Sequence, residues 1–470
     1  MLDVSPEEIT EGNLLRALLV LAVPLLAQNV VQVVQQVIDI IFLGRLSDDA
    51  VAAVGLAAPL VGLLFVVMIV TYVGTQIVVS RRIGGGDESG ARQALVTGLA
   101  VAVALGTVAG AVGFLAARPV VELLTAVRPD ARGEFVGLAA QYLSVLALGL
   151  PVLALADTVE QGGFVAWGDS RAALYMNLVA LGGNIVLNPL LIFGVWVFPR
   201  LGVQGAALAT VLGSVGGLVV GGMLVARGRN DGMVSRAALG FDADAAREIL
   251  DVGGPVGGQQ SVRHLLRLPV FLLVFIAGGG AGLAAYVIGA RAASIAFIPP
   301  QGLQAAAQSV IGQNLGAGDA FRARRTTWLG VGVSAGTLTL VGAGQWLVPG
   351  PIAMAFAPTL SAEALSLTVE YLRILAYGYP ALGAIYLFEA GFNAAGRSRV
   401  SFASTLLQYG GIRLPFAAAG VLLLAADVSA VFWAVTVSNV AAAVWLGLYY
   451  RYSTADGMMR RAASDAAGTA

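Results

Sequence analysis

The sequence predicts an all-α polytopic membrane protein, with twelve transmembrane helices in two homologous six-helix bundles. Three observations predict it: an apolar composition, the recurrence of long apolar blocks, and a repeat that relates the two halves of the chain. Hydrophobic residues make up 58% of the 470 residues, charged residues make up 11%, and the mean hydropathy is +0.84. Soluble domains carry roughly 25% charged residues. The composition therefore indicates a membrane protein.

The apolar blocks define the predicted helices. About 20 residues, at ~1.5 Å per residue, cross the ~30 Å hydrocarbon core of a bilayer. In the first half the predicted helices are residues 14–43, 50–79, 91–117, 136–164, 171–195 and 202–226. In the second half they are residues 245–276, 282–312, 323–348, 364–394, 399–424 and 428–450. The first block is too long for a cleavable signal peptide and no small-residue cleavage site follows it, so we expect a permanent helix.

A single long charged connector, residues 226–248, separates six predicted helices from six. The predicted domains are an N-terminal segment (1–13), an N-terminal lobe (14–226), a linker (227–244), a C-terminal lobe (245–450) and a C-terminal tail (451–470).

The two halves are related by an internal repeat. Residues 76–92 match residues 308–324 at a constant offset of 232, with seven of 17 positions identical and no gap. Residues 142–151 ("YLSVLALGLP") likewise match residues 371–380 ("YLRILAYGYP"), which aligns Glu160 with Glu389, and Gln28 pairs with Gln259. An even number of helices per half gives both copies the same orientation, so the predicted pseudo-twofold axis lies along the membrane normal.

The arginines predict the orientation of the chain. Most loop arginines, among them Arg81, Arg322 and Arg397, fall on one side of the predicted membrane, and few, such as Arg45 and Arg200, fall on the other. Loops rich in Lys and Arg stay in the cytoplasm. Both termini are therefore expected on the cytoplasmic side of the cell membrane.

The composition argues against several kinds of chemistry. Cysteine is absent and there is one histidine, which argues against disulfides and zinc sites. The glycine-rich loops "IGGGD" and "LGAGD" lack the Lys-Ser/Thr of a P-loop and follow membrane helices. Tight turns, with Asp87 and Asp319 near the start of the next helix, explain them better. No catalytic motif is found, so we expect neither an enzyme nor a cofactor other than a coupling ion.

One predicted helix carries a charge within its apolar run. In "QQVIDIIFLG", Asp39 shares a helix face with Gln36 and Gln35, and Gln32 and Gln28 continue that face. An ionisable residue in the membrane costs at least ~2.5 kcal/mol and usually faces a cavity or a partner. A polar seam that holds helices together is the simpler alternative. A carboxylate is a costly choice for such a seam, so a water-accessible site is the favoured interpretation.

Further polar side chains lie in the fourth, fifth and sixth predicted helices. They are Tyr142, Asp157, Glu160, Asn177, Asn184, Asn188 and Thr210. Their oxygens could coordinate a hard cation such as Na⁺ or share a proton. Alternatively, the two carboxylates of the fourth helix are solvated at its cytoplasmic end, and the tyrosine only packs.

The second half is basic where the first is acidic. Arg263 and Arg267 lie in the helix equivalent to that of Asp39, and Arg413 lies deep in the eleventh predicted helix. Two interpretations stay open: a charge-paired gate between the bundles, or a basic group that neutralises Glu389 within its own lobe. We assign these four residues, with Gln35, Gln36 and Asp157, to a substrate cleft or gate.

The chain resembles the multidrug and toxic compound extrusion (MATE) family of cation-coupled exporters. The similar segments are residues 22–46, 166–194, 202–210 ("GVQGAALAT") and 311–319 ("IGQNLGAGD"). The resemblance implies two lobes around a central cleft and antiport of Na⁺ or H⁺ against amphipathic, often cationic compounds. It also implies an ion site at Asp39, Tyr142, Asn184, Asn188 and Thr210, where a coupling Na⁺ could be bound by Asp39, Asn184 and Asn188.

The sequence departs from that pattern at Asn188, where many relatives have a second aspartate. Glu160 lies near a position where the family is expected to have asparagine, so the second carboxylate is either relocated to Glu160 or lost. In the first case Asp39 and Glu160 together form the site, and in the second Asp39 works alone.

The predicted function is secondary active multidrug efflux by alternating access. The alternatives are a flippase of lipid-linked precursors, which would need a strongly cationic cleft, a channel, or a membrane-anchored scaffold. The expected partners are small amphipathic substrates and the lipid bilayer, with no nucleic acid, and we expect a monomer.

Overall fold

A computed structural model describes residues 6–46, 48–125, 134–231, 233, 240–356 and 360–468. Within these ranges the regular structure is helical throughout. The helices of the first half are α1 (Pro6–Glu11), α2 (Leu14–Leu46), α3 (Asp48–Gly84), α4 (Glu88–Thr125), α5 (Glu134–Asp157), a π-helical segment (Thr158–Val165), α6 (Ser170–Phe193), α7 (Val203–Ala226) and a 3₁₀ turn (Arg229–Asp231).

The second half contains more and shorter helices. They are α8 (Ala243–Leu265), α9 (Arg267–Ala296), α10 (Ile298–Gly316), α11 (Ala320–Leu347), α12 (Pro349–Phe356), α13 (Ala362–Ala394), α14 (Ser398–Leu406), a π-helical segment (Leu407–Arg413), α15 (Leu414–Ala418), a second π-helical segment (Ala419–Leu423), α16 (Ser429–Ala455) and α17 (Met458–Gly468).

Nine stretches of the described helices are long and apolar enough to cross a membrane. One of them, Ala243–Ala296, has 54 residues, which is more than twice the ~20 residues that one crossing needs. Gly279 interrupts this stretch with a φ of +53°, at the connection expected between residues 276 and 282. The all-α, multi-span prediction is confirmed, and a count of twelve spans is consistent with the helices.

The packing of the backbone divides the chain into two units. Unit 1 contains residues 23–257, and unit 2 contains residues 7–22 and 258–469. The units cross the repeat boundary, because residues 7–22 belong to unit 2 and residues 243–257 belong to unit 1. Two helices, α2 and α8, therefore each contribute one part to each unit.

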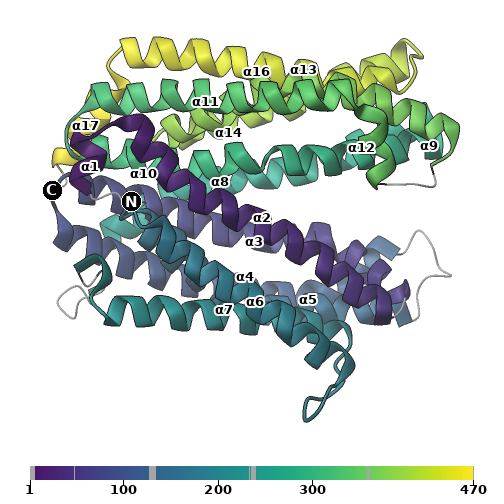
Figure 1. The fold of residues 1–470 in the computed structure, drawn as a ribbon, viewed down its shortest axis with the longest axis horizontal. Helices are drawn as coiled ribbons and strands as arrows, with labels where there is room; N and C mark the ends of the chain where they lie inside the picture. Colours follow the sequence, from purple (N-terminus) through teal and green to yellow (C-terminus); the bar gives the residue numbers. More distant parts are fainter. Residues whose placement is uncertain are drawn as a thin grey trace. The chain divides into compact units, whose positions relative to one another are not determined.

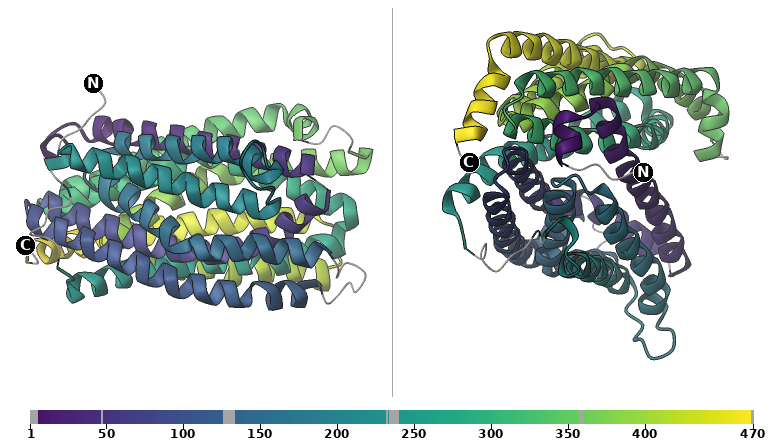
Figure 2. Two further views of the ribbon diagram at one scale, coloured as in Figure 1. Left: turned by 90° about the horizontal axis from the view of Figure 1, so that it is seen from below. Right: turned by 60° about the vertical axis from the view of Figure 1, so that its left-hand side comes forward.

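Unit 1 is built from pairs of long helices that lie along one another, as Figure 2 shows for its purple to teal segments. The pairs α4–α5 and α6–α7 have the closest association, and α3 packs on both α4 and α5. Small residues permit these approaches: a Cβ on Gly213 of α7 would lie 2.4 Å from the carbonyl oxygen of Ala180 in α6. A Cβ on Gly253 of α8 would lie 1.9 Å from the carbonyl oxygen of Val70.

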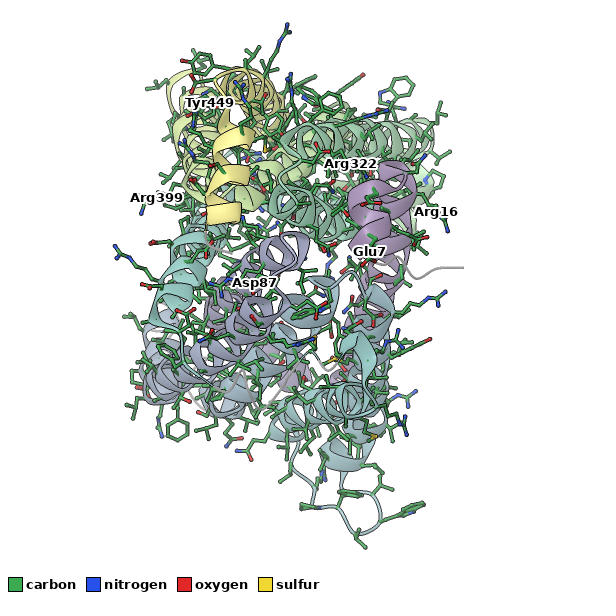
Figure 3. The ribbon with its side chains drawn as sticks, turned by 90° about the vertical axis from the view of Figure 1, so that its left-hand side faces the viewer. Glu7, Arg16, Asp87, Arg322, Arg399 and Tyr449 are labelled. Carbon is green, nitrogen blue, oxygen red and sulfur yellow. The ribbon has the colours of Figure 1, made fainter. Side chains whose placement is uncertain are left out.

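Unit 2 is organised around α13, which packs against α9, α10, α11 and α16. Figure 1 shows α11, α13 and α16 running alongside one another. The core is aromatic, and the rings of Tyr371 and Phe432 are stacked with centroids 4.2 Å apart. The first turns of the chain are fixed to this unit by Arg322, whose guanidinium donates to the carbonyl oxygens of Ile9 (3.0 Å) and Gly12 (2.7 Å) (Figure 3).

The glycine-rich loops are turns, as predicted. Gly86 and Gly318 have φ values of +77° and +80°, in the left-handed region that glycine adopts without steric cost. Asp87 accepts from the backbone N–H of Gly90, and Asp319 from that of Arg322, both at 2.8 Å. These side chains cap the N-termini of α4 and α11.

Candidate ion and substrate sites

The residues around Asp39 form a hydrogen-bonded cluster in unit 1. Asn188 of α6 donates from Nδ2 to Oδ1 of Asp39 in α2 across 2.6 Å. The same nitrogen donates to Oδ1 of Asn184 at 2.9 Å, one turn away on the same face of α6. Nδ2 of Asn184 lies 3.0 Å from Oγ1 of Thr210 in α7. Three helices thus meet around one carboxylate.

Two more predicted residues border this cluster. Gln35 is buried, and its Nε2 lies 2.8 Å from the Asn184 amide. The ring of Tyr142 in α5 packs with partly buried Phe42 around Leu43 and Ile192. The side chain of Gln36 lies outside the part of the chain that the structure describes.

One atom of the Asp39 cluster has no hydrogen-bond partner. Asn188 is 1% exposed, and its side-chain oxygen Oδ1 is buried without a donor among the described residues. An unpaired buried acceptor costs about 1–3 kcal/mol, so this oxygen is available for a ligand. With the carboxylate and the other side-chain oxygens, it offers the all-oxygen environment that hard cations prefer. Asp39 can alternatively take up a proton.

A second carboxylate cluster lies elsewhere in unit 1. Glu160 is held in the π-helical segment and is 8% exposed. Its oxygens accept hydrogen bonds from Gln28 of α2, from Gln161 (3.0 Å), and from Asn177 of α6. Asp157, the last residue of α5, interacts electrostatically with Glu160. Such π-helical segments are often found at functional sites.

The structure keeps Glu160 apart from Asp39. Glu160 accepts its hydrogen bond from Gln28 of α2. Asp39, which accepts from Asn188, lies eleven residues further along the same helix. At 1.5 Å per residue these points are about 16 Å apart on the helix axis. The two carboxylates therefore do not share one site in this conformation, and Asp157 accompanies Glu160.

Unit 2 repeats the Glu160 arrangement with one change of charge. Glu389 of α13 is 1% exposed, and its Oε1 accepts from Nε2 of Gln259 at 2.5 Å. Arg263 donates from Nη2 to Oε1 (3.0 Å) and Oε2 (3.2 Å). Glu389 and Gln259 occupy the positions of the second repeat that are equivalent to Glu160 and Gln28 in the first. In the second half the carboxylate is neutralised within its own unit.

The other predicted arginines of unit 2 are placed differently. Arg413 is 7% exposed and bonds to Oγ of Ser438 (3.0 Å) and Oδ1 of Asn439 (2.7 Å). Its guanidinium lies 4.0 Å from the ring centroid of Tyr409. Arg267 is exposed at the start of α9, where it lines a cavity together with Arg263 and Tyr409.

Sequence reasoning missed some of these residues. Tyr409, Gln408 and Asn439 were not identified as candidates, although Asn439 is a polar residue within the apolar last span. A polar residue within a predicted span is a signal of a functional position, and it could have identified Asn439. The contact between Arg413 and Tyr409 was also missed, although residues four apart on a helix are neighbours, so the spacing could have indicated it.

Known proteins are similar to this chain in sequence and in fold. The MatE family model matches residues 24–190 and 264–419. A protein named probable multidrug resistance protein NorM from Pseudomonas aeruginosa is 29% identical over 460 residues, covering 96% of this chain and 92% of that protein. A protein named FAD transporter from Shewanella oneidensis is 28% identical over 393 residues, covering 81% of this chain and 82% of that protein.

A solved structure of a MOP superfamily transporter from Pyrococcus furiosus superimposes with a TM-score of 0.85 at 23% identity, covering 96% of this chain and 98% of that one. This likeness establishes the fold. Together with the family match over more than half of the chain, it establishes a multi-pass membrane transporter: the chain belongs to the MatE family of multidrug and toxic compound extrusion transporters.

Proposed function

We propose that the protein is a secondary active efflux antiporter, which exchanges extracellular H⁺ or Na⁺ for amphipathic, often cationic compounds by alternating access. The observation that carries the proposal is the Asp39 cluster, in which a carboxylate within a membrane helix meets Asn188, whose own side-chain oxygen has no partner among the described residues. The ion-coupling group is Asp39, with Asn184, Asn188 and Thr210 around it and Tyr142 at its border.

The energetic requirement supports this assignment. A ligand shifts a conformational equilibrium only through its differential affinity for the two states. A group in the membrane that binds an ion or proton in one state and not in the other supplies such a difference. Two observations support Asp39 in this role: its closest hydrogen-bond donor, Asn188, is a neutral amide, and no arginine of the described chain forms an ion pair with it.

Orientation is part of the proposal. We place both termini in the cytoplasm of a cell whose plasma membrane holds the protein, and the extracellular ion then enters from the side opposite the termini. The distribution of arginines supports this orientation. Among the relatives, one is named for multidrug resistance and one for FAD, so the substrates of related proteins differ in kind.

The test uses protein reconstituted into vesicles and ethidium, an aromatic cation, as the substrate. A Na⁺ gradient and a pH gradient are imposed separately, and ethidium movement is followed by fluorescence. We expect one gradient to drive transport by the natural protein, and neither to drive it in Asp39→Asn. Glu363→Gln, which changes an exposed carboxylate at the start of α13, is the control and should transport normally. Gradient-driven transport by Asp39→Asn would refute the assignment.

A further inference from the structure

Unit 2 contains a basic cavity that the ion-coupling assignment does not use. Its volume is about 220 Å³, and residues of α8, α9, α10, α13 and the π-helical segment 407–413 line it. Arg263, His264 and Arg267 belong to the lining, and no acidic side chain does among the described residues. The cavity therefore carries positive charge within a membrane protein, where charges are usually paired.

The internal carboxylate of unit 2 does not balance this charge. Glu389 is occupied by Arg263 through two hydrogen bonds. Arg413 stacks on Tyr409, a lining residue, and its hydrogen bonds go to the neutral Ser438 and Asn439. Of the two arginines in the lining, Arg263 is paired with Glu389, and Arg267 has no carboxylate partner among the described residues. The exposed guanidinium of Arg267 is therefore suited to an anion.

The rest of the lining is aromatic and apolar. Phe297, Tyr386 and Tyr409 contribute rings, and the centroids of Phe297 and Tyr386 are 6.5 Å apart. Leu382 and Ile385 supply aliphatic surface. Aromatic walls contact planar ligands over a large area. An arginine beside them pairs with carboxylate or phosphate through two parallel hydrogen bonds.

The volume limits the size of the ligand. A cavity of roughly 150 Å³ holds benzene, so about 220 Å³ accommodates one small ring system and an anionic group. We propose that this cavity of unit 2 binds an aryl anion, a small aromatic compound with a phosphate or carboxylate group, with Arg267 as the residue that contacts the anionic group. The inference rests on the proposed efflux function, since it names a second, anionic class of substrate for the same transporter.

Arg267 is the residue best suited to a test. It is exposed, and it makes no ion pair or hydrogen bond with any described residue, so its replacement breaks no internal contact. Arg291 is the matched control, because it is another exposed arginine of the same helix, α9, that does not line the cavity.

The experiment measures equilibrium binding of phenyl phosphate by calorimetry, with the full chain in phosphatidylcholine nanodiscs. The uncharged benzyl alcohol and the cationic benzylammonium serve as matched probes. We expect the phosphate to bind at least tenfold more tightly than either. Arg267→Gln should weaken its binding at least tenfold, Arg267→Lys should recover most of the loss, and Arg291→Gln should bind like the natural protein.

Equal binding of the three probes, or equal affinities in Arg267→Gln and Arg291→Gln, would overturn the proposal. Loss of phosphate binding in nanodiscs that contain phosphatidylglycerol would assign the site to a lipid headgroup and contradict a solute site. This binding is measured without an ion gradient, so its result does not depend on ion-driven transport. Failure of ion coupling and failure of the anion site can thus be told apart.

Discussion

Asn188 links the proposed coupling carboxylate to the rest of unit 1, since a single amide nitrogen contacts both Asp39 and Asn184. We expect Asn188→Leu to reduce ion-driven ethidium transport in vesicles at least tenfold, because the variant loses both this donor and the unpartnered oxygen. Ser214→Ala is the control, since that hydroxyl donates to the carbonyl of Thr210, one turn along α7. Normal coupling in Asn188→Leu would show that the cluster does not hold the ion.

The Arg263–Glu389 pair makes a prediction about stability. Arg263→Gln leaves a buried carboxylate without its counter-ion, and breaking a buried pair from one side typically costs ~3–5 kcal/mol. Glu389→Gln combined with Arg263→Gln removes both charges and should cost less than the single change. Thermal unfolding in detergent measures both variants. A double variant less stable than Arg263→Gln alone would contradict the interpretation.

The sequence predicted part of this residue-scale detail. Helical spacing put Gln35 and Asp39 on one face and Asn184 and Asn188 on another, and the structure brings these faces together. The partner of Arg263 was left open between a charge-paired gate and Glu389 of its own lobe, and only the three-dimensional contact with Glu389 distinguishes the two. The separation of Glu160 from Asp39 likewise depends on where the end of α5 lies along α2, which periodicity does not determine.

At the scale of elements, the packing of α6 against α7 positions Asn184 and Thr210 of the proposed ion site. A Cβ at Gly213 would lie 2.4 Å from the backbone oxygen of Ala180 and 3.1 Å from the backbone nitrogen of Asn184. Backbone atoms cannot move aside as a flexible side chain can. Gly213→Ala should therefore push the helices apart at Asn184.

We expect Gly213→Ala to lower stability by about 1–3 kcal/mol and to reduce ion-driven transport. Gly222→Ala, on the same helix with no heavy atom within 4 Å of the added Cβ, is the matched control. It should be neutral or slightly stabilising, since alanine favours a helix over glycine by roughly 0.5–1 kcal/mol. Thermal unfolding and vesicle transport measure both variants, and equal behaviour of the two would refute the packing argument.

Helices were predicted well where apolar length alone defines them, as for α6 and α7, whose ends fall within two residues of the predicted ones. Short elements were missed. Helix α12 has 8 residues and α17 has 11, too few to span a bilayer and therefore without the long apolar run that identifies a span. The π-helical segments were also missed, because a local widening of the helix leaves no clear mark in an apolar sequence.

At the scale of the whole molecule, the two packed units do not coincide with the two halves of the sequence repeat. The difference lies in α2 and α8, each of which is divided between the units. The first part of α8 belongs to unit 1, where Val252 and Val256 pack with Val73 and Ile77 of α3. The repeat located the homologous halves, but it compares equivalent positions of the two copies and cannot reveal which copy a helix end packs against.

This division makes a prediction for two adjacent glycines. A Cβ at Gly253 would lie 1.9 Å from the carbonyl oxygen of Val70, whereas one at Gly254 meets nothing within 4 Å. Gly253→Ala should therefore lower stability by about 1–3 kcal/mol, and Gly254→Ala should change it by no more than about 0.5 kcal/mol. Thermal unfolding measures the stability of both variants. A larger effect at Gly254 would contradict the packing of α8 on α3.

The central claim is that Asp39, and not Glu160, couples ion movement to export. The most direct test adds ethidium to vesicles and records the resulting flux of H⁺ and Na⁺ in Asp39→Asn and Glu160→Gln side by side. We predict that Asp39→Asn loses the flux and that Glu160→Gln, whose carboxylate is replaced by a group that can still bond to Gln28, retains it. Flux that persists in Asp39→Asn and disappears in Glu160→Gln would contradict the account.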